Sequence, residues 1–191
     1  APGRAVQVER LMARDRLTRE MAEKTLTFQM GIEEKRKLAA YVIDNSGTFT
    51  KTAGVSTDLG ARVVFNHLNG SSINVPAGRS ILLSAGGSFT GTSTGTGVGA
   101  TLNAGNWTST AGTMAGNWQW NGGNISVGTL TNSGTLTIGG TGSSVISGAA
   151  AELSNIGTIL YTKTAGQFGF GLIGSKLTNQ VGGVIDLQSD I

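Results

Sequence analysis

Cysteine is absent from this 191-residue chain, and proline, aromatic and charged residues are scarce. Without cysteine the chain forms neither a disulfide nor a thiolate site. Pro occurs twice and Gly 31 times, which excludes both collagen and a proline-rich linker. With 6% aromatic residues, a compact core of large side chains would be thin. The formal net charge of +3 is too small to describe a basic face for nucleic acid.

Long apolar stretches are also missing. No run of about 20 apolar residues occurs, so the sequence predicts no membrane span. The first letters, APGRAVQVERLMARDR, lack the apolar centre of a signal peptide. The chain begins with Ala and stops inside a repeated unit, so we expect the native protein to be longer.

Charge and glycine divide the chain into two regions. Residues 1–44 hold nine basic and seven acidic residues but two glycines, whereas residues 45–191 hold nine charged residues and 29 glycines. Between Arg79 and Glu152 no residue is charged. We therefore predict two domains, a helical N-terminal segment over 1–44 and a repeat region over 45–191.

The first region has helical periodicity. The run RLTREMAEKTLTFQM places Leu17, Met21 and Phe28 on one stripe, which predicts helix over residues about 8–43. This helix would cap the first coil of the repeat region, or it would serve as an oligomerisation or anchoring element. The letters EEKRKLAAYVIDNSGTF resemble a helical segment of phage major capsid proteins.

The second region repeats a short phrase. LTNSGTLTIGG returns as LSNIGTILYTKTAG and as DNSGTFTKTAG. In each copy an Asn precedes a Gly and then an alternating apolar run. The Asn residues are separated by 24, 63, 23 and 24 residues, and 63 is close to three shorter turns; they are Asn45, Asn69, Asn132, Asn155 and Asn179. A period of this length indicates a solenoid.

A longer repeat contains several copies of the short one. TKTAG occurs at 50–54 and again at 162–166, an offset of 112 residues that also aligns Phe65 with Leu177. The chain would therefore contain one 112-residue super-repeat and the start of a second. Lys51 and Lys163 are equivalent in this alignment, and we expect both to point outward and keep a face soluble.

Three strands of about five residues with their turns account for about 23 residues. We therefore predict an all-β, parallel β-solenoid of about six coils, with Leu, Ile, Val and Phe inward and Thr and Ser outward. Gly would supply the corners, and Asn side chains would stack in hydrogen-bonded ladders.

The phrase N-x-G-T-φ-x-K-T-x-G, together with GTMAGNW and GGVIDLQSD, resembles the β-solenoid repeats of giant bacterial surface and secreted proteins. Filamentous haemagglutinin and autotransporter passenger domains are of this kind. The resemblance covers residues 45–191. It implies a right-handed parallel β-helix that serves as an extracellular stalk or adhesive surface, and it supplies no catalytic residue.

Groups for chemistry are few. The repeat region has four acids, Asp58, Glu152, Asp186 and Asp190, too scattered to predict an acid–base pair. His67 is the only histidine, so we expect no metal site and a turn or surface position for this ring. The loops GTGVG and GGTGSSVISG lack the lysine of a phosphate-binding loop. The sequence therefore predicts no catalytic residue and no cofactor.

The three tryptophans have two interpretations. AGNW occurs twice, so Trp107 and Trp118 would occupy related corners, and Trp118 shares a strand face with Trp120. All three rings would stack on a carbohydrate if they were exposed. We favour the core, because Trp is on average a highly buried residue.

We therefore predict a non-enzymatic, extracellular or cell-surface protein segment with a structural or adhesive role. Its partners would be neighbouring solenoid repeats, surface glycans or further copies, with neither nucleic acid nor membrane span. The alternative is a carbohydrate-binding or polysaccharide-depolymerising β-helix of the phage-tail or lyase type.

Overall fold

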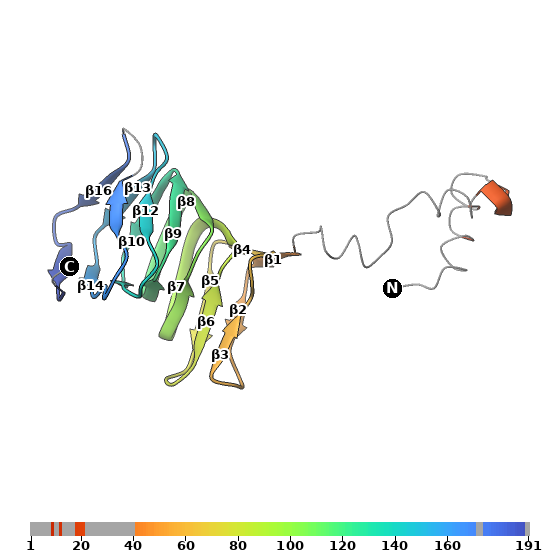
Figure 1. The fold of residues 1–191 in the computed structure, drawn as a ribbon, viewed down its shortest axis with the longest axis horizontal. Helices are drawn as coiled ribbons and strands as arrows, with labels where there is room; N and C mark the ends of the chain where they lie inside the picture. Colours follow the sequence, from red (N-terminus) through yellow and green to blue (C-terminus); the bar gives the residue numbers. More distant parts are fainter. Residues whose placement is uncertain (1–8, 10–11, 13–17, 22–40, 171–173, 190–191) are drawn as a thin grey trace. The chain divides into compact units, whose positions relative to one another are not determined.

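The computed structural model describes residues 9, 12, 18–21, 41–170 and 174–189. Its contacts divide the chain into two compact units, Ala1–Ala39 and Ala40–Ile191. The second unit is built from strands wound into a solenoid (Figure 1).

The described residues of the first unit include short helical pieces. Glu9, Met12 and residues 19–21 are helical. The backbone N–H of Met21 donates to the hydroxyl of Thr18 at 3.3 Å, which is the contact of a helix N-cap. Met21 is 56% exposed. The other residues of the predicted stripe lie outside the described residues.

The predicted C-terminal end of the helix is wrong. Residues 41–45 form strand β1, which pairs in parallel with β4. Val42 and Ile43 are β-branched and suit a strand, and the pairing with β4 places Ile43 opposite Phe65. Tertiary pairing therefore overrides the helical pattern of the preceding residues in this stretch.

The solenoid has three walls, each a stack of parallel strands. Wall A consists of β1 (Tyr41–Asn45), β4 (Val63–His67), the first parts of β7 (Gly86–Leu102) and β8 (Asn106–Trp120), β9 (Gly123–Val127), β12 (Ser144–Ile146) and β15 (Phe168–Phe170). Wall B consists of β2 (Thr48–Thr50), β5 (Ser71–Val75), the middle parts of β7 and β8, β10 (Thr129–Asn132), β13 (Glu152–Asn155) and β16 (Lys176–Asn179). Wall C consists of β3 (Ser56–Asp58), β6 (Ser80–Leu83), the last parts of β7 and β8, β11 (Thr135–Ile138), β14 (Thr158–Tyr161) and β17 (Val184–Leu187).

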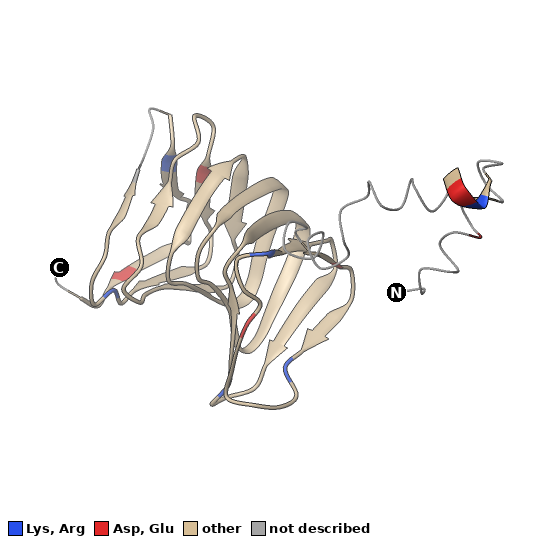
Figure 2. Cartoon of the chain, turned by 45° about the vertical axis from the view of Figure 1, so that its right-hand side comes forward, with Lys and Arg blue, Asp and Glu red and all other residues tan. Residues whose placement is uncertain are grey.

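These pairings confirm the predicted parallel β-solenoid of about six turns. Every strand of the middle turns has a partner on both sides, so its backbone N–H and C=O groups are satisfied. The inward positions alternate with outward ones, as in β5, where Ile73 and Val75 are 0% exposed. Charged residues are sparse on the solenoid, and its long central strands carry none (Figure 2).

The two long strands, β7 and β8, run through the corners between the walls, and their pairing has register shifts between Thr90 and Thr92 and between Gly95 and Ala100. Gly97 and Gly116 lie at such corners with φ values of 70° and 69°. A Cβ at Gly97 would collide with the carbonyl oxygen of Val75, and one at Gly116 with that of Gly95. Only glycine accepts both the left-handed backbone and the close approach of the neighbouring turn.

The recurring Asn forms the predicted ladder at one corner. Asn132, Asn155 and Asn179 are neighbours in wall B and are called the amide ladder below. Nδ2 of Asn132 donates to Oδ1 of Asn155 at 2.8 Å, and Nδ2 of Asn155 donates to Oδ1 of Asn179 at 2.7 Å. The spacings of 23 and 24 residues are therefore the lengths of single turns.

Asn45 and Asn69, in the first turns of the solenoid, lie outside the amide ladder. Asn45 ends β1 in wall A and pairs with His67, so the predicted equivalence of Asn45 and Asn69 is wrong. Asn69 lies in the next turn, where its Oδ1 accepts the N–H of Thr92 at 3.0 Å. The same phrase therefore builds the corner from wall A to wall B near Asn45 and the corner from wall B to wall C in the amide ladder.

The 112-residue offset also aligns residues that lie in different walls of the solenoid. Phe65 lies in wall A, whereas Leu177, its partner in the sequence alignment, lies in wall B. Lys51 follows a strand of wall B, and Lys163 follows a strand of wall C. The offset therefore relates strand-and-corner units, and the second copy of each lies one wall further along the coil.

Candidate functional site

A pocket of about 230 Å³ lies beside Lys51 at the first turn of the solenoid. It is lined by Phe49, Thr50, Lys51, Thr52, Ala53, Thr57 and Ile81. Lys51 is the only charged group in this lining. The ammonium of Lys51 donates to the carbonyl oxygen of Ala53 at 2.6 Å and to the hydroxyl of Thr57 at 2.7 Å.

The lysines of the two TKTAG phrases are both buried, so the prediction that they point outward is wrong. Lys51 is 7% exposed and Lys163 is 0% exposed. Lys163 donates to the carbonyl oxygens of Gly142 at 2.5 Å, Gly139 at 3.2 Å and Asn121 at 3.5 Å. Burial lowers the pKa of Lys163. Corner loops leave carbonyl groups unpaired, and a lysine that turns inward satisfies them.

His67 is also inside, not on a turn or the surface as predicted. Its ring is 0% exposed and stacks on Phe89 with centroids 4.3 Å apart and an interplanar angle of 11°. Nδ1 lies 3.3 Å from the hydroxyl of Ser93, which accepts a hydrogen bond from Ser71 at 2.9 Å. Burial lowers the pKa of His67 to about 3, so the ring is neutral at physiological pH.

The tryptophans lie in the core. Trp107, Trp118 and Trp120 are 0%, 1% and 0% exposed, so none offers a ring face to a sugar. In both AGNW copies the indole N–H donates to the carbonyl of the motif's own alanine, Ala104 at 3.1 Å and Ala115 at 2.9 Å. The two corners are therefore built alike.

Several of these rings lie together in an aromatic cluster. It consists of Phe65, His67, Phe89, Trp107 and Trp118. Its ring centroids lie between 4.3 and 6.1 Å apart for the contacts that involve His67. The cluster fills the interior where aliphatic residues are few in the sequence.

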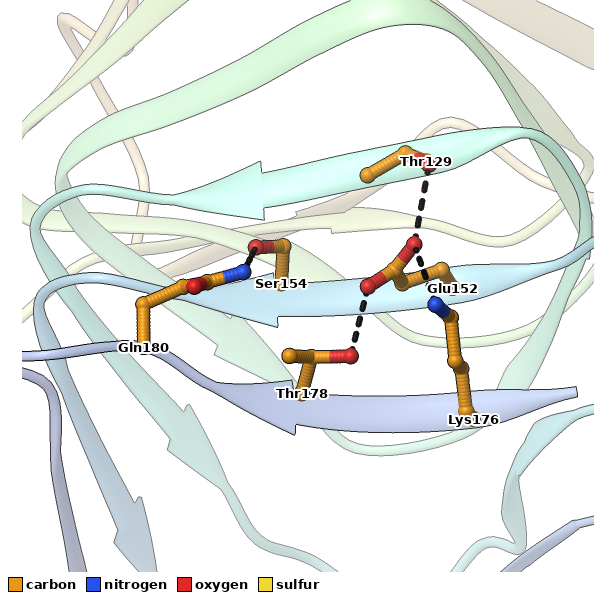
Figure 3. A network of polar contacts seen from close by, with 6 residues as sticks. All are labelled: Thr129, Glu152, Ser154, Lys176, Thr178 and Gln180. Carbon is orange, nitrogen blue, oxygen red and sulfur yellow. Dashed lines mark hydrogen bonds and ion pairs between the residues drawn. The ribbon is translucent and has the colours of Figure 1, made fainter.

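Among the acids that the structure describes, Glu152 has the largest number of polar partners (Figure 3). It accepts hydrogen bonds from Thr178 at 2.6 Å and from Thr129 at 3.3 Å, and it forms an ion pair with Lys176 at 3.4 Å. The hydrogen bond from Thr178 is the main cause that lowers the pKa of Glu152; Lys176 adds to it, and partial burial opposes it. Its oxygens are thus occupied by neighbours on the adjacent strands, as a structural carboxylate's are.

The other acids stand apart from it. Asp58 accepts from the N–H of Gly60 at 2.8 Å and from Ser84 at 2.7 Å. Asp186 accepts from Gln188 at 2.7 Å. Both lie in wall C at its opposite ends, and Leu82, Thr101, Gln119, Thr137 and Leu160 occupy the positions between them. Asp190 lies outside the described residues.

A cluster of acidic and histidine side chains, or a long apolar helix, would indicate a metal site or a membrane span in the described part of the chain. No group of three His, Asp or Glu side chains lies close enough together there to hold a metal ion. None of its helices has the length and apolar character to cross a membrane.

The fold is that of a parallel β-solenoid with a lysine-containing pocket at its first turn. The profile of the dephospho-CoA kinase family (CoaE) matches residues 3–51. No solved structure matches the chain at a significant level. The matched segment thus covers the N-terminal unit and extends through β1 and β2 of the solenoid to Lys51.

The curated proteins that the chain matches are also dephospho-CoA kinases. The chain is 49% identical over 43 residues to the dephospho-CoA kinase of Lactococcus lactis, which is 22% of this chain and 20% of that enzyme. It is 53% identical over 45 residues to the dephospho-CoA kinase of Geobacter sulfurreducens, or 24% of this chain and 23% of that enzyme. The chain therefore spans about a fifth of the length of the curated relatives it matches.

These matches overturn the predicted function. A non-enzymatic structural or adhesive protein is contradicted, because residues 3–51 are similar to a family of kinases. The predicted extracellular or cell-surface location is wrong for the same reason, since it followed from the stalk interpretation. The carbohydrate alternative has no better support. The likeness of residues 33–49 to phage capsid proteins also gives way to the kinase match.

Proposed function

We propose that this protein acts in the phosphorylation of dephospho-CoA, with residues 3–51 contributing part of a kinase unit. The observation that carries the proposal is the match of these residues to the dephospho-CoA kinase family, with identities of 49% and 53% to two such enzymes. Residues 3–51 contain no G-x-x-x-x-G-K-[ST] motif, so the phosphate-binding loop of the kinase unit would lie outside the matched residues.

The charge of the segment supports this role. Nine of the 14 basic residues of the chain lie within residues 1–44. Phosphoryl transfer depends on positioning and on positive groups that stabilise the charge of the transferred phosphoryl group. The segment also holds seven acidic residues, so its net charge is +2; its many basic side chains, and not a net basic charge, are what suits a substrate with several phosphate groups.

The solenoid would hold the end of this segment in place. Ile43 pairs with Phe65, and the N–H of Lys51 donates to the carbonyl of Asn74 at 3.0 Å. Nδ2 of Asn45 also donates to the carbonyl of Ser72 at 3.1 Å. The last residues of the matched segment are therefore fixed by strand pairing to the next turn.

Two finer features belong to the same proposal. We infer a right-handed coil, because crossovers between parallel strands are almost always right-handed. We also infer that the N-terminal segment is mainly helical up to β1. The helical residues 19–21 and the N-cap contact of Thr18 support this inference.

A chimaera tests the kinase proposal. Residues 3–51 would replace the matching segment of the Lactococcus lactis enzyme, and ATP-dependent conversion of dephospho-CoA to CoA would be measured. We expect kcat/KM within about tenfold of the parent enzyme, because the segment is related to the one it replaces.

The control chimaera carries residues 112–160 of the solenoid, a segment of equal length, and should be inactive. A folded 3–51 chimaera without activity would overturn the proposal. The purified 191-residue chain should in addition bind dephospho-CoA through its N-terminal segment, measured by calorimetry against a variant that lacks residues 1–40.

A further inference from the structure

The ammonium of Lys51 lies at the wall of the first-turn pocket, and one of its N–H donors has no partner among the described residues. A lysine ammonium has three N–H donors. Among the described residues, Lys51 uses two of them, toward Ala53 and Thr57, and both of these partners line the pocket. Lys51 is only 7% exposed, so water is largely excluded from its side chain.

Lys163 shows what a fully partnered lysine of the same phrase contacts. Its three acceptors are backbone carbonyls of loops in earlier turns, at Asn121, Gly139 and Gly142. Lys51 lies in the first turn, so no described turn precedes it to supply such carbonyls. An oxygen-bearing ligand in the pocket would complete the partners that Lys163 obtains from the fold.

The geometry points to a binding site for a phosphate group in this pocket. Lys51 supplies the positive charge, and Thr50, Thr52 and Thr57 bring hydroxyl groups to the lining. A charge that is withdrawn from water gains most from a partner of opposite sign. No carboxylate lines the pocket to compete for the ammonium.

Asp58, the acid next to the pocket residue Thr57 in sequence, has hydrogen-bond partners outside the pocket. Asp58 follows Thr57 in β3, so its side chain projects to the opposite face of the strand. Its Oδ1 accepts from the N–H of Gly60 and from the hydroxyl of Ser84. Phe49 and Ile81 form an apolar side of the pocket, which suits an organic phosphate, whose carbon portion would contact them. Lys51 is the last residue of the matched segment 3–51, but the pocket is lined by residues of the first two turns of the solenoid and needs no kinase activity.

The test is titration of the full chain with inorganic phosphate at constant ionic strength. Binding would be followed by backbone NMR shifts and by the rise in Tm that a ligand of the folded state produces. We expect the largest shifts at Thr52, Ala53 and Thr57. Lys51→Met should weaken binding by about tenfold or more, because it removes a charged hydrogen bond.

Two matched variants sharpen the result. Lys51→Arg keeps the charge and should retain binding, and Lys176→Met removes a 61% exposed lysine in wall B and should change nothing. The proposal is overturned if the folded wild type shows no response to phosphate, or if its shifts lie away from the pocket. It is equally overturned if Lys51→Met binds phosphate like the wild type. Neither ATP nor dephospho-CoA is present, so the outcome is separate from that of the kinase test.

Discussion

The early and late turns of the solenoid fill their interiors by different means. The aromatic cluster packs through the volume of its rings, and turn lengths around it vary from 18 residues between Asn106 and Asn124 to 22 between Ser71 and Ser93. The amide ladder works through directional hydrogen bonds, and its turns keep 23 and 24 residues. Ring packing tolerates changes in turn length, whereas an amide must meet the next amide at hydrogen-bond distance.

The aromatic cluster should respond most strongly to the loss of volume. Trp118→Ala removes a side chain that is 1% exposed and contacts His67 and Phe89 at centroid distances of 5.1 and 5.5 Å. We expect the free energy of unfolding to fall by about 3–5 kcal/mol, because the cavity would not collapse completely. Urea unfolding measures the loss.

The neighbouring Gln119 provides the control for this change. It lies on the opposite face of the same strand, where its amide reaches the carbonyl of Val98 at 3.5 Å. Gln119→Ala should cost about 0.5 kcal/mol or less. Equal losses for the two variants would show that the cluster is not a packed core.

The amide ladder should respond to the loss of hydrogen bonds. Asn155 is 0% exposed and bonds to Asn132, Asn179 and the carbonyl of Val184. We expect Asn155→Ala to lower the free energy of unfolding by about 2–3 kcal/mol, because it leaves buried polar groups without partners. Chemical denaturation with hydrogen exchange would locate the loss in the late turns.

An exposed amide pair is the matched comparison. Asn106 is exposed, and its Oδ1 accepts a hydrogen bond from Nδ2 of Asn124 at 3.2 Å on the outer face. Its replacement by Ala should change stability by about 0.5 kcal/mol or less. A similar result for Asn155→Ala would contradict the view that the ladder stabilises the late turns.

The aromatic cluster should also be sensitive to acid, and the ladder should not. The folded pKa of His67 is about 3, against 6.5 for the unfolded residue. Between these values the unfolded chain binds a proton that the folded chain does not, so stability is full above pH 6.5 and declines as the pH falls toward 3. The slope contributed by this residue is about 1.4 kcal/mol per pH unit.

His67→Phe isolates the effect. The phenyl ring would stack on Phe89 in place of the imidazole and would not titrate. Urea midpoints measured from about pH 7 to about pH 4 should fall less steeply in the variant than in the wild type. Parallel curves would mean that His67 binds its proton at the same pH in the folded and unfolded states, against the lowered pKa.

Much of the fold was predictable from the sequence. The spacing of Asn132, Asn155 and Asn179 predicted both the turn length and the ladder, because a stacked amide must recur once per turn. The candidate site was not predictable. Lys51 and Lys163 were expected outside, because the sequence does not show which corner carbonyls lack partners. The kinase relationship of residues 3–51 was missed, because no residue type or spacing in that segment by itself identifies a chemistry.

The sequence by itself determined that the chain forms strands of a parallel solenoid, since glycine corners, β-branched strands and a recurring Asn are local properties. The tertiary structure decided which wall each phrase occupies and which polar side chains turn inward. His67 is buried because Phe65 contacts it from the same strand, β4, and Phe89 stacks on it from the next turn; Asn45 is paired with His67 in the strand register instead of with another Asn. Such pairings depend on the lengths of all the preceding turns, because each inserted residue shifts the next strand along the wall.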